Sequence, residues 1–199
     1  MEFSEVPELV CSHVEADTRV AYHLSVLANA VPGQNIVIRA TDADIIVILL
    51  YHASRVNANV WLEVGHSSDN TRRYIHITAL ANHLGPCLCK ALSGYHTLTG
   101  CDYTSSLFRK GKVNPLKIAE KNALHIEGLG YISETTTFDD SDRLLEKFVF
   151  LLYGQKGLTS VDEARLKIFK ENTNQPTVRV LCKISKALMQ ACLHPVRMF

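Results

Sequence analysis

Acidic residues at three separate places in the chain have the chemistry to bind divalent cations. Glu15 and Asp17 lie in "HVEADTR", Asp42 and Asp44 in "IRATDADII", and Asp102 in "LTGCDYTSS". A carboxylate leaves water only at a high cost unless a cation receives it. If the fold brings these five carboxylates to one edge of a sheet, they remain ionised together only when divalent cations neutralise them. Oxygen ligands of this kind suit Mg²⁺ or Mn²⁺.

The elements that must position these residues are predicted from hydrophobic periodicity. Residues 15–30 predict a helix that "VPG" stops, and residues 35–41 predict a β-branched strand of the kind buried in parallel sheets. Residues 45–53 fit either a strand or a buried helix. Further along, the sequence predicts strands at 59–65 and 72–77, helices at 78–85, 86–98, 114–123, 143–154 and 160–171, and loops at 99–106 and 128–142.

The alternation of helix, strand and helix predicts an α/β domain up to Asn122, followed by a helical tail. In a parallel α/β sheet, the loops at the carboxyl ends of the strands gather at one edge, and ligands bind there. For Asp42 and Asp44 a simpler alternative is a capped turn at the start of a helix, because Asp is a favoured N-cap.

Composition excludes several classes of protein. The 21 basic and 20 acidic residues give a net charge of +1, so a nucleic-acid partner would need a local basic patch. The six cysteines lack the paired spacing of a zinc site and are expected to be reduced, mostly buried thiols in a nuclear or cytoplasmic protein. The N-terminus lacks the pattern of a signal peptide, and the longest apolar run is too short to cross a bilayer. We therefore expect a protein that is not secreted and has no membrane partner.

The order of the acidic motifs resembles the flap-endonuclease branch of the PIN-like nucleases. That family has a carboxylate–Ala–carboxylate at a helix start, a strand followed by T-x-D-x-D, and a hydrophobic helix ending in G-x-D-Y. The counterparts are "EAD" at 15–17, "ATDAD" at 40–44 and "GCDY" at 100–103, and the resemblance covers residues 11–121. Together with "SVDEAR", these motifs are also similar to an uncharacterised animal group associated with mobile-element-like genes.

The resemblance implies a partial PIN-like domain over residues 1–122, with a mostly parallel sheet sandwiched by helices, and a helical tail over 123–199. It implies one or two Mg²⁺ or Mn²⁺ ions. Glu15 and Asp17 would hold the first ion, with Asp17 bridging, and Asp42, Asp44 and Asp102 would hold the second. Asp17, Asp42 and Asp44 would be the catalytic residues of a two-metal phosphodiester hydrolysis.

A basic segment is similar to the family's helical hairpin, which binds the DNA backbone. It is "FRKGKVNPLKIAEK" at 108–121, in which Arg109, Lys110, Lys112 and Lys117 would contact phosphates of DNA rather than RNA. Without the resemblance, the same residues would be a solvated helix face.

The family's first strand and its aspartate should precede Glu15, where only fourteen residues stand. We therefore expect weak or absent cleavage by this chain alone, and self-association or a partner chain that covers the missing strand. One alternative is a non-catalytic remnant that binds nucleic acid or protein. Another is a haloacid-dehalogenase-like phosphohydrolase, with Asp42 as nucleophile and the acidic pair of "FDD" at 138–140 as metal ligands.

Overall fold

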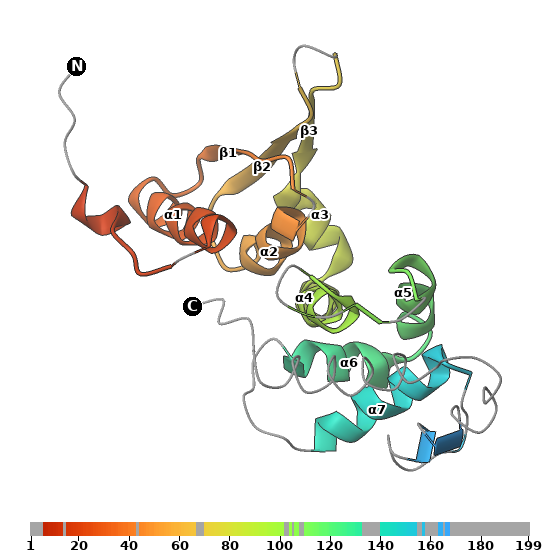
Figure 1. Ribbon diagram of the computed structural model, residues 1–199. Coiled ribbons are helices and arrows are strands. Elements are labelled where there is room, and N and C mark those ends of the chain that lie inside the picture. The colour runs from red at the N-terminus through yellow and green to blue at the C-terminus, as the bar shows by residue number, and fades with distance from the viewer. Residues whose placement is uncertain are drawn as a thin grey trace. The chain divides into compact units, whose positions relative to one another are not determined.

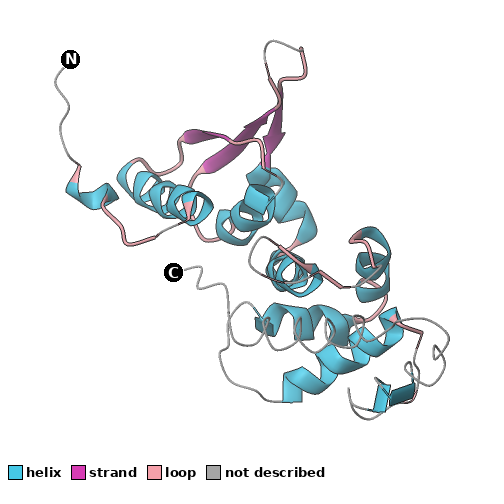
Figure 2. Ribbon diagram, in the orientation of Figure 1, coloured by secondary structure: helices cyan, strands magenta, loops and turns pink. Residues whose placement is uncertain are grey.

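The computed structural model describes two compact units, which divide between Cys89 and Lys90 and are treated separately below. Figures 1 and 2 show the helices and strands of both units. The described residues are 6–13, 15–42, 44–66, 70–101, 104, 106–107, 110–132, 140–154, 157, 163–164 and 166–167, without the side chains of 140–142.

The first unit, residues 1–89, is an α/β arrangement, as the sequence predicts. Its elements are η1 (Pro7–Leu9), α1 (Ala16–Ala30), β1 (Asn35–Arg39), α2 (Asp44–Ala53), β2 (Asn59–Val64), β3 (Arg73–His76), α3 (Ile77–Leu84) and the start of α4 (Pro86–Thr99). The chain after α1 turns through Gly33, whose φ of 75° favours glycine. The predicted helix at 15–30 and the predicted strands are therefore confirmed.

The sheet has the order β1-β2-β3, with β1 parallel to β2 and β2 antiparallel to β3. It is a mixed sheet, not the mostly parallel sheet that the resemblance implied. Strand β1 reaches β2 through α2, which supplies the crossover that a parallel pair requires. The antiparallel β3 instead follows β2 through a short connection, so it needs no crossover helix.

One face of the sheet carries the core of the first unit. Val60 and Leu62 of β2 are fully buried there, beside Ile38 of β1, and Figure 1 shows α1, α2 and α3 on this side. On the opposite face, Val37 is 55% exposed and Tyr74 is 51% exposed. Within the described part of this unit, helices α1, α2 and α3 cover one face of the sheet, and the sandwich stays a prediction.

Residues 45–53, which fit both a strand and a helix, form α2. Ile45 and Leu49 are fully buried and Leu50 nearly so, and α2 contacts both α1 and α3. A helix with helices on either side has little face left for polar residues, so its sequence is apolar nearly all round. This is why its periodicity could not separate the two alternatives.

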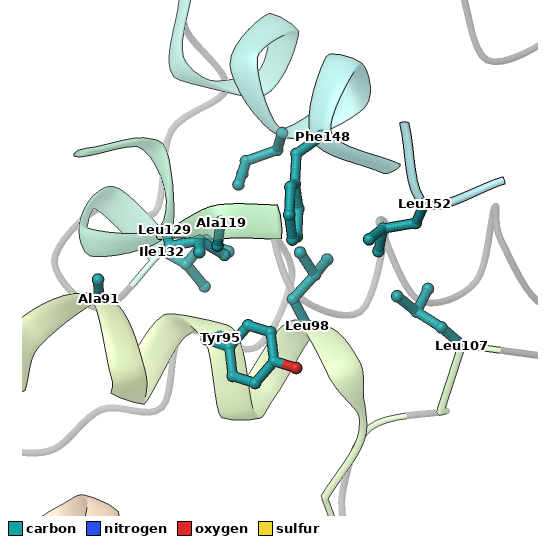
Figure 3. Close-up of a cluster of buried hydrophobic side chains, with 10 residues drawn as sticks. Ala91, Tyr95, Leu98, Leu107, Ala119, Leu129, Ile132, Phe148 and Leu152 are labelled. Carbon is teal, nitrogen blue, oxygen red and sulfur yellow. The ribbon is translucent and has the colours of Figure 1, made fainter. Parts of the chain in front are cut away.

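The second unit, residues 90–197, is helical in its described part. It contains the rest of α4, α5 (Val113–Ala119), α6 (Ala123–Ile132) and α7 (Asp140–Leu152). Figure 3 shows its hydrophobic core, in which Phe148 of α7 lies among side chains from the other helices. The core residues are Ala91, Tyr95, Leu98, Leu107, Ala119, Leu129, Ile132, Leu145, Phe148 and Leu152.

The loop predicted at 128–142 is wrong at both ends, because α6 continues to Ile132 and α7 begins at Asp140. Gly128 and Gly130 suggested a loop, yet both are buried in α6. A Cβ added at Gly128 would lie 3.3 Å from Cβ of Leu144, so glycine here allows close packing of α6 on α7. Tertiary packing thus overrides the low helix propensity of glycine. The domain boundary predicted after Asn122 falls between α5 and α6. That a PIN-like domain ends there stays a prediction.

Candidate metal and nucleic-acid site

Asp42 and Asp44 lie at the carboxyl end of β1, where α2 begins. The backbone N–H of Asp44 donates a hydrogen bond of 3.0 Å to Oδ1 of Asp42, and Asp44 is the first residue of α2. Asp42 therefore satisfies one of the backbone donors that a helix start leaves without an intrahelical partner. Its side chain is exposed and that of Asp44 is half-buried. The hydrogen bond gives Asp42 a structural role at the start of α2 and engages one of its two carboxylate oxygens.

Glu15 and Asp17 lie at the start of α1, as the sequence predicts. Glu15 is the N-cap residue, its side chain makes no capping hydrogen bond, and Asp17 is in the first helical turn. Carboxylates at this position are stabilised by the helix dipole. The segment before them is tied down, because Nε of Arg19 donates to the His13 carbonyl at 2.6 Å and the Tyr22 hydroxyl donates to the Glu8 carbonyl at 2.9 Å. These two hydrogen bonds connect the segment before Glu15 to helix α1.

Asp102 and Tyr103 lie outside the described residues, but the residues on either side of them are fixed by Thr104. The Thr104 hydroxyl is buried and donates to the Thr97 carbonyl at 2.7 Å, and it accepts the Cys101 backbone N–H at 3.1 Å. Gly100 precedes them with a φ of 109°, and a Cβ there would lie 2.5 Å from Cα of Ser106. The positive φ and the close approach of Ser106 explain the glycine of "GCDY" structurally.

The described acidic residues supply two pairs of carboxylates on neighbouring elements, since α1 contacts both α2 and β1. Among the residues that the structure describes, no three His, Cys, Asp or Glu side chains are grouped closely enough to hold one metal ion. Glu15, Asp17, Asp42 and Asp44 therefore do not by themselves form a complete Mg²⁺ or Mn²⁺ centre, and the predicted fifth ligand, Asp102, falls outside the description. The metal site stays a prediction.

The basic segment contains α5, which Glu120, Lys121 and Asn122 connect to α6, and the helical hairpin stays a prediction. Its lysines differ in their surroundings. Nζ of Lys110 lies 4.9 Å from the centre of the Tyr153 ring, and Nζ of Lys112 lies 3.0 Å from Nδ1 of His96.

Lys112 and Lys117 are exposed, whereas Lys110 is half-buried. Among the predicted phosphate ligands, the exposed side chains of Lys112 and Lys117 are the best placed to reach a polyanion. Lys110 packs against an aromatic ring, and Arg109 lies outside the described residues.

The sequence analysis missed a charged cluster on the open face of the sheet. Oε1 of Glu63 lies 3.1 Å from Nε of Arg72 and 3.6 Å from Nε of Arg39, so it forms ion pairs with both arginines. The Tyr74 hydroxyl donates a hydrogen bond of 3.2 Å to Oε2 of Glu63. Beside this cluster, the rings of Trp61 and His76 stack with their centres 4.0 Å apart. The signal was the strict alternation along β2, which places Trp61 and Glu63 on the face opposite Val60 and Leu62.

Four cysteines, Cys11, Cys87, Cys89 and Cys101, are free thiols, as expected, but the further expectation that the cysteines are mostly buried holds for Cys89 alone among these four. Cys182 and Cys192 lie outside the described residues. None of the helices in the described ranges has the length and apolar character needed to cross a membrane. Comparison of the chain with protein-family models, with curated proteins and with solved structures found no match.

Proposed function

We propose that this chain is a nuclease-derived domain of the PIN-like type, whose acidic residues are part of a divalent-metal centre for phosphodiester hydrolysis. The observation that carries the proposal is the position of Asp42 and Asp44. They lie between the carboxyl end of a strand in a parallel pair and the helix that follows it, which is where α/β proteins bind their ligands. The acidic start of α1, a helix that contacts both of these elements, is the second part of the argument.

In this proposal Glu15, Asp17, Asp42, Asp44 and Asp102 would hold the ions, which supply a Lewis acid and an activated water when bound. The protein's own contribution is to fix the carboxylates on two helix starts and one strand end. As in the sequence analysis, we expect weak or absent cleavage by this chain alone.

The test compares metal binding and cleavage in one set of variants. Mn²⁺ binding is measured by titration calorimetry. Cleavage is measured with end-labelled single-stranded and branched DNA as substrates, and with RNA of the same sequences. A reaction with a chelator is the control. Asp42→Asn and Asp44→Asn keep the shape of the side chain and remove its charge. The proposal predicts that Mn²⁺ binds the parent chain and that either variant weakens binding at least tenfold.

The matched control is Glu127→Gln, which removes an exposed carboxylate of α6 that the proposal does not use. The metal-centre proposal fails if the parent chain binds no Mn²⁺, or if Glu127→Gln weakens binding as much as Asp42→Asn does. Robust Mg²⁺-dependent cleavage that Asp42→Asn abolishes would support the centre and contradict the expected weakness of the isolated chain.

A second candidate function, nucleic-acid binding without cleavage, is favoured by the capping role of Asp42. A carboxylate that caps α2 has a structural reason to be kept without any metal. The exposed side chains of Lys112, the N-cap residue of α5, and Lys117 within α5 would then make sequence-independent phosphate contacts. Lys112→Ala and Lys117→Ala together should lower DNA affinity and reduce its salt dependence. Val113→Ala, an exposed apolar change in the same helix, should leave both unchanged.

A further inference from the structure

Strand β1 is paired along one side only within the described residues, because the sheet order is β1-β2-β3. The hydrogen bonds at its two ends show which residues face β2. The Gln34 carbonyl accepts the Asn59 N–H at 2.9 Å, and the Ala40 N–H donates to the Glu63 carbonyl at 3.3 Å.

In a parallel pair, a residue that bonds the neighbouring strand directs both its N–H and its C=O to that strand, and alternate residues direct theirs away. Gln34 and Ala40 are even-numbered, so the even-numbered residues of β1 face β2. Asn35, Val37 and Arg39 direct their backbone groups to the open edge, and all three are exposed.

The two edges of the sheet differ in how they are protected. The β3 edge is four residues long, begins with Arg73 and is directly preceded by Arg72, and charged residues at an edge oppose pairing with another strand. Strand β1 is one residue longer and has one charged residue, Arg39, at its end. Val37 at its centre is 55% exposed, and the strand contains no proline. The edge of β1 is therefore the one open to another strand.

We propose that β1 pairs with β1 of a second copy of this chain, antiparallel and centred on Val37, to form a homodimer with one continuous sheet. The register follows from the edge-directed residues. Pairing Val37 with its own copy places Asn35 opposite Arg39 and Arg39 opposite Asn35, so that each of these pairs exchanges two backbone hydrogen bonds. No edge-directed group of the strand is left out, and no like charges stand opposite one another.

A second copy fits this edge for three reasons. The two-fold axis of an antiparallel pair closes the assembly, so that growth stops at the protected β3 edges. The net charge of +1 adds little repulsion between copies. The axis also keeps both helix layers on the same face of the joined sheet. Helix α1, which contacts β1, exposes Leu27, and Val31 directly after the helix is also exposed.

The first experiment measures molar mass by light scattering and sedimentation over a concentration series. The parent chain is expected to form a concentration-dependent dimer. Val37→Lys places two lysines opposite each other across the axis, where like charges are destabilising, and should weaken dimerisation at least tenfold. The matched control is Tyr74→Lys, an equally exposed position on the same face of the other edge strand, which should leave the dimer intact.

A second experiment remains informative if Val37→Lys fails to fold. Val37→Cys is a smaller change, and the two cysteines of the proposed dimer would face each other within the Cα separation that a disulfide allows. Mild oxidation should cross-link Val37→Cys into a covalent dimer well beyond the background of the parent chain, and should not do so for Tyr74→Cys. A parent chain that stays monomeric at high concentration would overturn the proposal. So would a dimer that Tyr74→Lys disrupts and Val37→Lys does not, or cross-linking by Tyr74→Cys alone.

Discussion

Asp44 donates its backbone N–H to Oδ1 of Asp42 across 3.0 Å, so the same aspartate that a metal centre would require also starts helix α2. The two roles make different demands on the side chain. Capping needs an oxygen acceptor and no charge, whereas a Mg²⁺ or Mn²⁺ ligand needs the charge as well.

Substitutions at Asp42 separate these two roles. Asp42→Ala removes the acceptor and is expected to lower the free energy of unfolding by about 1 kcal/mol in the absence of metal. Asp42→Asn keeps the acceptor and should stay close to the parent chain. Chemical denaturation with a chelator present measures both variants. If Asp42→Asn were as destabilised as Asp42→Ala, the charge itself and not the cap would be holding the start of α2.

Gly94 lies where α4 meets α6, and its missing side chain makes room for that contact. A Cβ at this position would overlap the Leu129 carbonyl oxygen and lie 3.0 Å from Cβ of Ile132, so the two helices would have to separate. We expect Gly94→Ala to cost about 1–3 kcal/mol of unfolding free energy, the usual range for overpacking.

The control for Gly94 is Gly130→Ala in α6. Its nearest contact would be Cδ of Lys90 at 3.5 Å, an ordinary van der Waals distance. Because alanine is the better helix former, this change should be neutral or stabilising by up to about 1 kcal/mol. The melting temperature should fall for Gly94→Ala and should stay the same or rise for Gly130→Ala. Equal losses would show that α4 and α6 do not meet at Gly94 as described.

His52 of α2 is expected to make stability depend on pH. Burial, followed by the nearby charge of Arg55, lowers the pKa of His52 from 6.5 to about 4. Between these values the unfolded chain binds more protons than the folded chain, so this contribution to the free energy of unfolding is complete above pH 6.5 and is lost as the pH falls toward 4. The loss amounts to about 3 kcal/mol at most.

Urea denaturation at several pH values between 4 and 7 tests this dependence. His52→Gln should flatten the slope, whatever its effect on stability at neutral pH. A parent slope that His52→Gln does not alter would assign the acid sensitivity to other groups.

Thr104 is expected to hold the segment on either side of Asp102 through its hydroxyl. Thr104→Val keeps the shape and leaves the Thr97 carbonyl and the Cys101 N–H without this partner, which should cost about 1–3 kcal/mol. Thr104→Ser retains the hydroxyl and should lose much less. Hydrogen exchange at the Cys101 amide gives a local measurement, with faster exchange expected for Thr104→Val only. Unchanged exchange in that variant would argue against the proposed anchor.

The sequence by itself determined the elements whose pattern is local. β-branched residues specified β1, the alternation along β2 separated its buried and exposed residues, and the carboxylates at 15–17 and 42–44 were correctly placed at a helix start and a strand end. These features follow from backbone propensity, capping and side-chain alternation, which act over a few residues.

Tertiary structure decided what depends on partners far along the chain. Only packing against α1 and α3 made residues 45–53 a helix, and only the close approach of α7 allowed glycine-containing residues 128–132 to continue α6. The antiparallel pairing of β3 depends in the same way on which strands meet. So does the exposure of the sheet face that carries Val37, and no local pattern encodes either feature. Burial gains more free energy than local propensity costs, so long-range contacts prevail wherever the local signal is weak.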